Sequence, residues 1–195
     1  MSEPARPAVT FDCMTYLQAT ASPTGPAAAC FRLVEAGRVR LLSSQTILDE
    51  VRDVLERPRI RKKNPRLTDE LVGAFLAHVV SLAPPAAVVP TAFTYPRDPK
   101  DEPYLNLAIA EKAEVLVSWD NDLLDLMKPD NPDGQRLRAL APGLRILTPP
   151  DFLGVIRAAD AARTPDAGPA SAGPSAPSGE SQSANDEAPG DRPGP

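Results

Sequence analysis

The sequence holds few of the residues on which several common enzyme chemistries depend. Of its 195 residues, 1 is histidine and 2 are cysteine. A Ser-His-Asp or Cys-His catalytic system is therefore poorly supplied, and Cys13, Cys30 and His78 lack the spacing of a zinc site. We expect both cysteines to be small buried hydrophobic residues and His78 to be a packing or surface residue. Few cysteines and no signal peptide indicate a reducing cytoplasm.

Long apolar runs and phosphate-binding loops are also missing. No apolar run approaches the roughly 20 residues of a membrane helix, so we expect a soluble cytoplasmic protein that does not bind membranes. The patterns G-x-x-x-x-G-K-[ST] and G-x-G-x-x-G are absent. Aspartyl-phosphate phosphatases need Asp-x-Asp after their first strand, whereas Asp12 is followed two residues later by Met14. A small-molecule phosphotransfer enzyme on a doubly wound sheet is therefore only a third hypothesis.

The last part of the chain differs in composition from the rest. Residues 161–195 are rich in Pro, Ser, Ala and Gly and contain no aromatic residue, Leu, Ile or Val. Such a segment cannot bury enough apolar surface to offset the entropy lost on ordering. We therefore predict one domain over residues 1–160 and a disordered tail over residues 161–195.

Short β-prone runs alternate with amphipathic helices through the first 160 residues. Strands are expected at 8–11, 39–42, 115–118 and 145–148, with a weak one at 88–89. Helices are expected at 26–35, from a cap at Ser44 to Pro58, after a cap at Thr68, from 101 or 102, at 121–127 and from Pro149. This alternation predicts an α/β fold, a compact parallel sheet flanked by helices on both faces.

Acidic residues follow the strands or open helices at the edge where parallel sheets bind ligands. Asp12, Asp120 and Asp122 follow strands, and Asp101 and Glu102 stand at a helix entrance. Glu50 lies close to the apolar stripe of the helix after Ser44. Any one of them is more often a turn, cap or solvated residue, but together they would repel unless a cation held them. Oxygen ligands suit Mg²⁺ or Mn²⁺, and metal-activated water can attack a phosphodiester.

A basic run, RPRIRKKNPR from Arg57 to Arg66, contains no acid. It is equally compatible with a solvated loop and with a surface that holds nucleic-acid phosphates. The tail has two Arg and five acids, so it carries −3 of the total charge of −5 and leaves −2 on residues 1–160. This near-neutral body argues against a generally basic nucleic-acid coat but permits the local patch.

From about Ala8 to Ile156, several blocks in order resemble the PIN-domain nucleases, especially the toxin components of toxin–antitoxin systems. The segment FDCMTYLQA resembles the family's opening strand, with its first catalytic acid at Asp12. The segment SSQTILDEVRDVLERPRIRKK resembles the second block, with its acid at Glu50. The third and fourth blocks resemble RDPKDEPYLNLAIAEKAEVLVSWDNDLLDL, which places their acids at Glu102, with Asp101 beside it, and at Asp120 and Asp122. The closing strand and helix resemble RILTPPDFL.

The resemblance implies a compact fold with a parallel sheet, Mg²⁺ or Mn²⁺, cleavage of single-stranded RNA, a small antitoxin partner and frequent homodimers. Two positions depart from the family pattern. Met14 stands where many members have Asn, and Glu102 stands where most have Asp. Met cannot orient a carboxylate by hydrogen bonding, which motivates an alternative, a catalytically degenerate PIN domain that binds RNA or a partner.

We therefore expect a metal-dependent endoribonuclease. Its catalytic residues are expected to be Asp12, Glu50, Asp101, Glu102 and Asp120. Its metal ligands are expected to be Asp12, Glu50, Glu102, Asp120 and Asp122, directly or through water. RNA is expected to contact Arg59, Arg61, Lys62, Lys63 and Ser118, although Ser118 could instead orient Asp120.

Overall fold

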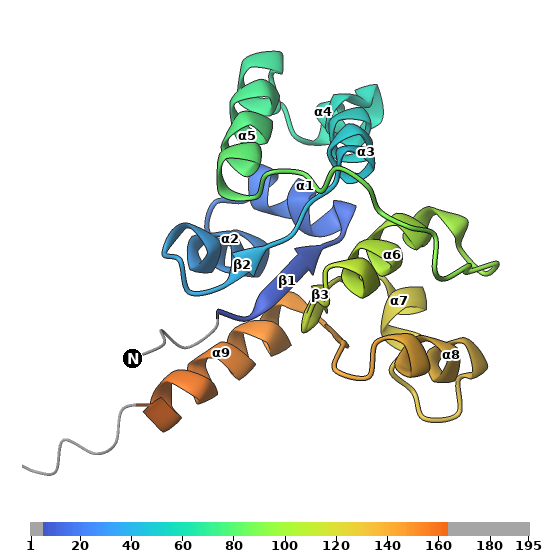
Figure 1. Ribbon diagram of the computed structural model, residues 1–195. Coiled ribbons are helices and arrows are strands. Elements are labelled where there is room, and N and C mark those ends of the chain that lie inside the picture. Colours follow the sequence, from blue (N-terminus) through green and yellow to red (C-terminus); the bar gives the residue numbers. More distant parts are fainter. Residues whose placement is uncertain (1–5, 164–195) are drawn as a thin grey trace, which may run out of the picture. The chain divides into compact units, whose positions relative to one another are not determined.

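The computed structural model describes residues 6–163. Four parallel strands form one sheet in the order β2-β1-β3-β4. They are β1 (Ala8–Phe11), β2 (Arg40–Leu41), β3 (Val115–Val117) and β4 (Arg145–Leu147). The first strand is thus an interior strand, with β2 on one side and β3 on the other (Figure 1). The predicted parallel α/β sheet is confirmed.

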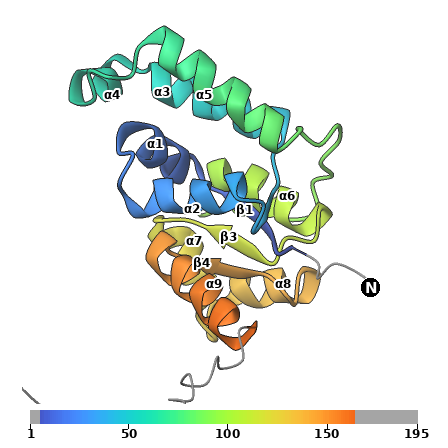
Figure 2. The same ribbon diagram turned by 90° about the vertical axis from the view of Figure 1, so that its left-hand side faces the viewer.

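Helices cover both sides of this sheet (Figure 2). In chain order they are α1 (Cys13–Ala21), α2 (Pro26–Glu35), α3 (Gln45–Glu56), α4 (Pro58–Lys63), α5 (Asp69–Leu82), the short 3₁₀ helix η1 (Pro99–Asp101), α6 (Glu102–Ala110), α7 (Asn121–Asp125), α8 (Pro132–Leu140) and α9 (Pro149–Arg163). Helix α6 packs on β1 and β3, while α9 packs on β3 and α2. Among residues 6–163, no helix is long and apolar enough to cross a membrane.

Local capping explains where several predicted helices begin. The Ser44 hydroxyl accepts a hydrogen bond from the Ile47 amide at 3.3 Å, and Thr68 accepts one from the Leu71 amide at 3.2 Å. Each bond satisfies an amide that the first helical turn leaves without a partner. Helix α2 has the predicted bounds, and it is followed by Gly37, whose φ of 62° lies in the left-handed region that glycine adopts without strain.

Several sequence-based expectations about local structure were wrong. The strand expected at 88–89 is absent from the described residues, where only an isolated bridge joins Ser44 to Ala86, and Val88 is 78% exposed. The helix after Ser44 ends before Pro58, as predicted, but Pro58 then opens α4, so the basic run is largely helical. Two helices, α1 and α8, were not predicted at all.

The end of the domain also differs slightly from expectation. Residues 161–163, which composition assigns to the tail, continue helix α9. The remainder of the predicted tail lies outside the described residues.

The core lies between the sheet and its helices. Phe11 of β1 packs edge-on against Tyr16 of α1 and Phe31 of α2, with ring centroids 6.0 and 5.1 Å apart. Cys13 and Cys30 are buried, as expected from the sequence. This packing holds α1 rigidly at the carboxyl end of β1, where the acidic residues gather.

Candidate active site

A cavity of about 240 Å³ lies where the carboxyl ends of β1 and β3 meet α3, α4 and the start of α6. We call it the acidic pocket. Its lining contains five carboxylates, two cations and an apolar wall: Asp12, Glu50, Asp98, Asp101, Asp120, Arg57, Lys100, Cys13, Met14, Val54, Ile60 and Tyr104. The sheet edge predicted from the strand pattern is therefore where the acids converge.

Asp12 is fixed at the floor of this pocket by the turn from β1 into α1. Its Oδ1 accepts a hydrogen bond from the Thr15 amide at 2.6 Å, which caps α1, and its Oδ2 accepts one from the Ser118 hydroxyl. Its own amide donates to the Val117 carbonyl at 3.0 Å, which extends the pairing of β1 with β3. Burial raises the pKa of Asp12, and the hydrogen bonds from Ser118 and Thr15 oppose that rise.

Ser118 connects the two strand ends. Besides donating to Asp12, its Oγ accepts a hydrogen bond from the Asp120 amide at 2.8 Å. Asp120 in turn accepts from the Asp122 amide at 2.7 Å and so caps α7. Ser118 is 0% exposed. The expected contact between Ser118 and RNA is therefore wrong. The buried hydroxyl already donates one hydrogen bond and accepts another, so it can orient Asp12 and Asp120 but cannot reach a substrate.

Asp101 enters the pocket from η1, which Asp98 caps by accepting from the Lys100 amide at 3.0 Å. Asp101 is 8% exposed, and its Oδ2 is buried without a hydrogen-bond partner among residues 6–163. Burial, followed by repulsion from Asp120, Asp98 and Asp12, raises its pKa to about 7. A buried carboxylate oxygen without a partner is costly, which indicates a site built for a ligand.

Glu102, the neighbour of Asp101, does not point the same way. Its Oε1 accepts a hydrogen bond from the Tyr95 amide at 2.7 Å, and it lines a different cavity together with Asn106. Asn106 holds the same segment, since its Oδ1 accepts from the Phe93 amide at 2.8 Å. The structure therefore brings Asp101 to the acidic pocket and uses Glu102 to fasten the chain that leads to it.

Glu50 reaches the pocket from α3, as the helical periodicity suggested. Its Oε2 accepts a hydrogen bond at 2.8 Å from the hydroxyl of Tyr104 on α6. Burial raises the pKa of the Cys13 thiol to about 12, and the negative charges of Glu50 and Asp12 contribute to that rise. The thiol therefore stays protonated, and Cys13 is not a nucleophile.

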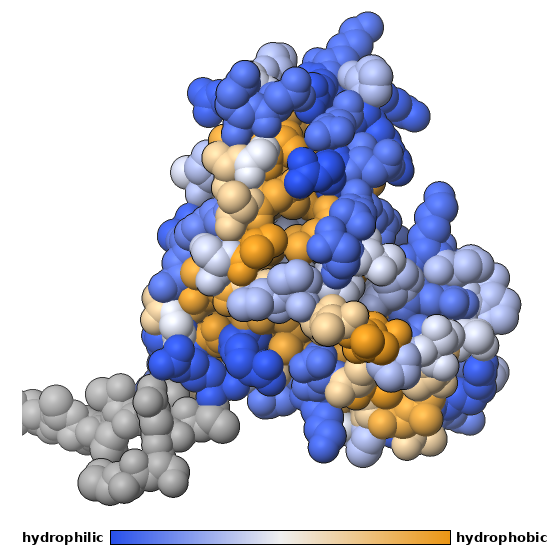
Figure 3. Space-filling view, turned by 45° about the horizontal axis from the view of Figure 1, so that its top comes forward, coloured by the Kyte–Doolittle hydropathy of each residue, from blue (hydrophilic) through white to orange (hydrophobic). Residues whose placement is uncertain are grey.

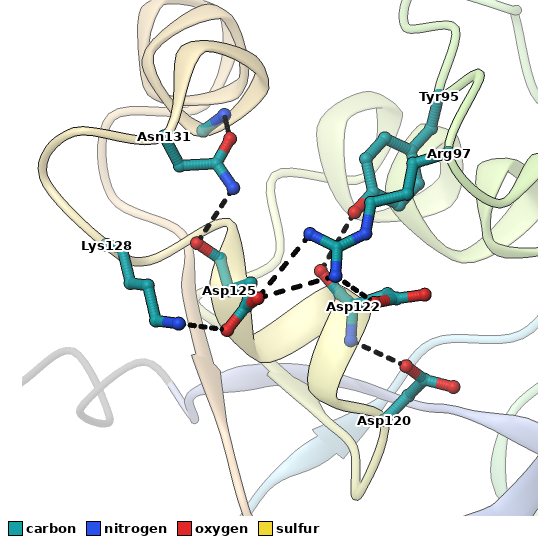
Figure 4. Close-up of polar contacts among 8 residues, drawn as sticks. Tyr95, Arg97, Asp120, Asp122, Asp125, Lys128 and Asn131 are labelled. Atoms are coloured by element: carbon teal, nitrogen blue, oxygen red, sulfur yellow. Dashed lines mark hydrogen bonds and ion pairs between the residues drawn. The ribbon is translucent and has the colours of Figure 1, made fainter.

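The carboxylate of Asp122 belongs to an ion-pair network (Figure 4). Its carboxylate pairs with Arg97, which also lies 3.4 Å from Asp125. Lys128 pairs with Asp125 at 2.6 Å, and its hydrogen bond is the main cause of the lowered pKa of Asp125. Asp122 is not part of the lining of the acidic pocket, and its ion pair holds α7 to the segment that carries Arg97. Its metal role stays a prediction.

Comparison with known families decides what kind of domain carries this pocket. A family model for the PIN domain matches residues 8–122, a range that contains every carboxylate of the acidic pocket. The chain belongs to the PIN-domain family. No curated protein and no solved structure matches the chain significantly. PIN domains are generally nucleases that act on nucleic acids and typically use divalent metal ions.

The basic run of this PIN domain lies beside the pocket. Arg57 lines the pocket and pairs with Asp53 at 2.5 Å. Arg61 pairs with Asp69 at 2.6 Å and donates to the Leu55 carbonyl at 3.4 Å, so it joins α4 to its neighbours. A phosphate-binding role for Arg61 is therefore disfavoured. Other cations of the run are exposed: Arg59, Lys62, Lys63 and Arg66.

Several lining residues, Lys100 among them, were not identified from the sequence. Asp98 lies in D-P-K-D, where an acid before proline predicts a helix cap. That pattern does not indicate that Asp98 also lines the pocket. Arg57 was counted as part of a charge run. Tyr104 follows Pro103 in what looks like an ordinary helix start, and nothing in the local pattern reveals its contact with Glu50 on another helix.

The residues of the pocket fit a divalent cation chemically. Its acidic side chains offer oxygen atoms as metal ligands, and the buried Asp101 Oδ2 has no hydrogen-bond partner among residues 6–163. Within the same residues, however, no three His, Cys, Asp or Glu side chains are grouped closely enough to hold an ion by themselves. A cation there would therefore be held by one or two carboxylates directly and by the others through water, the arrangement that Mg²⁺ usually prefers.

Proposed function

We propose that this PIN domain is a metal-dependent endoribonuclease that hydrolyses phosphodiester bonds in single-stranded RNA with Mg²⁺ or Mn²⁺. The observation that carries the proposal is the convergence of five carboxylates on one cavity, with a buried Asp101 oxygen that lacks a partner in the described residues. Such a group of like charges is costly unless a cation is bound. The family supports the nuclease activity. The resemblance of the sequence to toxin components of that family supports RNA as the substrate.

In the proposed site, Asp12 and Asp120 hold the cation directly, and Asp101 and Glu50 act through water. A bound divalent ion supplies an activated water and neutralises charge on the phosphate. The chain's residues set its place: Ser118 and Thr15 fix the Asp12 carboxylate, and the α7 cap fixes Asp120. Lys100, in the pocket lining, is positioned to attract the phosphate, whereas Arg57 beside it is paired with Asp53. Asp98 adds negative charge at the rim.

The exposed cations of α4 give RNA a path to the pocket. Arg59, Lys62 and Lys63 are exposed on the helix that also contributes Ile60 to the lining. Contacts of this kind hold a nucleic-acid backbone without reading its sequence. We propose that they bind the strand on one side of the scissile phosphate.

We further propose a toxin role with a small antitoxin partner and a homodimeric state. Figure 3 shows a band of apolar side chains between hydrophilic ones on one face of the molecule. Large hydrophobic residues that are exposed include Leu71 and Val80 of α5 and Val88 after it. An exposed apolar band such as the one in Figure 3 suits a protein partner. An adjacent small gene whose product co-purifies with this chain and blocks cleavage would support the antitoxin, and sedimentation of the chain alone tests the dimer.

The central test is cleavage by highly purified protein. With Mn²⁺ or Mg²⁺ the wild type should cut single-stranded RNA, chelation should stop the reaction, and fresh metal should restore it. Asp12→Asn, purified identically, controls for contaminating ribonuclease. Single-stranded DNA and duplex RNA of the same sequence test the assigned substrate class.

A second candidate function is a catalytically degenerate PIN domain that binds RNA or a partner. The observation that favours it is Met14, which lines the pocket and is 43% exposed where an orienting amide would stand in many members. If the wild type binds diverse RNAs with either metal and leaves all of them intact, the endoribonuclease proposal is wrong and this second function replaces it.

A further inference from the structure

We propose that Tyr104 is a positioning residue that holds the Glu50 carboxylate at the acidic pocket, ready for a metal-bound water. This inference rests on the proposed metal-dependent function. It assigns a role to a residue that carries no charge and belongs to no acidic motif.

The geometry of the contact is specific. Tyr104 is 2% exposed on α6, and its hydroxyl donates to Glu50 Oε2 on α3 at 2.8 Å. Both residues line the acidic pocket. The bond engages one carboxylate oxygen, and no hydrogen-bond partner for Glu50 Oε1 lies within residues 6–163. Oε1 is therefore left for a ligand in the pocket.

A glutamate on a helix needs such a contact more than the other acids do. Asp12 and Asp120 are held at strand ends by main-chain and Ser118 hydrogen bonds, whereas Glu50 has a longer side chain with more rotatable bonds. Ordering a Glu side chain costs about 1–2 kcal/mol in rotamer entropy, and the negative charge of Asp12 favours rotation of Glu50 away from the pocket. A single buried donor can oppose both effects.

Another tyrosine of the chain provides a matched control. Tyr95 is buried too, but its hydroxyl donates to the main-chain carbonyl of Asp122 at 2.9 Å. Tyr95→Phe and Tyr104→Phe each delete one hydroxyl and one hydrogen bond, so each should lower stability by a similar amount. They differ in whether the lost bond reaches a pocket carboxylate.

The experiment measures Mn²⁺ affinity by calorimetry on the full chain. Tyr104→Phe should weaken Mn²⁺ binding by about tenfold, the lower end of what loss of an outer-shell partner produces. Tyr95→Phe should leave the affinity within about twofold of the wild type, because its hydroxyl contacts no pocket carboxylate. Cleavage by Tyr104→Phe should recover toward the wild-type rate at saturating Mn²⁺. In a Glu50→Ala background, which lacks the acceptor, Tyr104→Phe should have no further effect on affinity.

The outcomes separate this inference from the proposed function. If the wild type binds Mn²⁺ and Tyr104→Phe binds it equally well, the tyrosine merely joins α3 to α6 and the positioning role is wrong. The positioning role is also wrong if both tyrosine variants lose affinity equally. If the wild type itself binds no Mn²⁺, the proposed metal site fails and this inference fails with it.

Discussion

Two acidic regions meet just after β3 and behave in opposite ways. In the acidic pocket, Asp120 joins other carboxylates, and burial and mutual repulsion raise the pKa of Asp101 to about 7. In the ion-pair network of Figure 4, Asp122 and Asp125 face Arg97 and Lys128, and the pKa of Asp125 is lowered. Asp120 and Asp122 are two residues apart, so the difference lies in the partners and not in the strand. Compensated acids hold structure, and uncompensated acids are available for a ligand.

The sharpest way to test this comparison exchanges each acid for its amide. Asp120→Asn should keep the cap of α7, because Asn also accepts the Asp122 amide, and should still lower cleavage by on the order of a hundredfold or more. Asp122→Asn should change cleavage by less than about threefold and cost under about 1 kcal/mol, as for a surface ion pair. Equal losses of activity in the two variants would show that the network belongs to the site. Turnover of a labelled RNA with Mn²⁺, beside chemical denaturation, measures both effects.

The same contrast between paired and unpaired charge applies to the cations of α4. Changing Arg59, Lys62 and Lys63 together to Ala should weaken RNA binding by about tenfold and flatten its salt dependence, since each phosphate contact on a single strand contributes a slope of about 0.7. Arg61→Ala should leave that slope unchanged and lower stability, because it removes the ion pair to Asp69. Fluorescence anisotropy at several salt concentrations checks both. An unaltered slope in the triple variant would show that these cations of α4 are solvated and do not contact RNA phosphates.

Stability against pH should differ in sign between the two regions. Asp101 keeps its proton in the metal-free folded state until about pH 7, while the unfolded chain loses it near 3.8. The folded state thus binds more protons between these values, so its stability should fall as pH rises through this window. Asp101→Asn should remove that fall and raise Tm at pH 8 by a few degrees, since about 1 kcal/mol moves Tm by roughly 2–4 °C in a domain of this size.

The matched variant in the network is Asp125→Asn. The lowered pKa of Asp125 contributes stability that is present at neutral pH and is lost only as pH falls below its unfolded value near 3.8. From about pH 4.5 to 8 this variant should therefore show a constant offset without a new slope. Thermal unfolding in a chelator, over that range, compares the two. A parallel slope for Asp101→Asn and wild type would contradict the assignment of the raised pKa.

The smallest effect is expected at Met14, on the apolar wall of the pocket. Met14→Asn adds an amide that can donate to a neighbouring carboxylate, so cleavage should stay equal or rise by up to about threefold. Met14→Ala, which adds no donor, is the control. A clear loss of activity in Met14→Asn alone would show that the exposed methionine contributes to the site in its own right.

The sequence predicts the parallel sheet and the position of Asp12 well, because a short apolar run followed by an acid leaves few alternatives. The orientation of Glu50 follows from helical periodicity, which places it near the buried face of α3. At the start of α6 the same reasoning fails. Adjacent helical residues point about 100° apart, so a single turn of η1 decides whether Asp101 or Glu102 enters the pocket.

Contacts between distant segments are the part that local patterns miss. The pairing of Arg61 with Asp69 and of Arg97 with Asp122 depends on how the elements pack. Helix α1 was missed because Cys13 follows Asp12 without a loop, so nothing separates the strand from the helix it opens. Helix α8 was missed although Asn131 caps it by accepting from the Gly134 amide at 2.9 Å.

The strand order has a consequence for the timing of synthesis. The first strand made, β1, pairs with β3, as in the register of Thr10 with Leu116. During translation, Asp12 and Glu50 therefore emerge long before the strand that completes the pocket, and such distant pairing forms slowly. We expect a nascent chain ending before Val115 to bind no Mn²⁺ and to cut no RNA. A nuclease with this topology would spare the message that encodes it until most of the domain had left the ribosome.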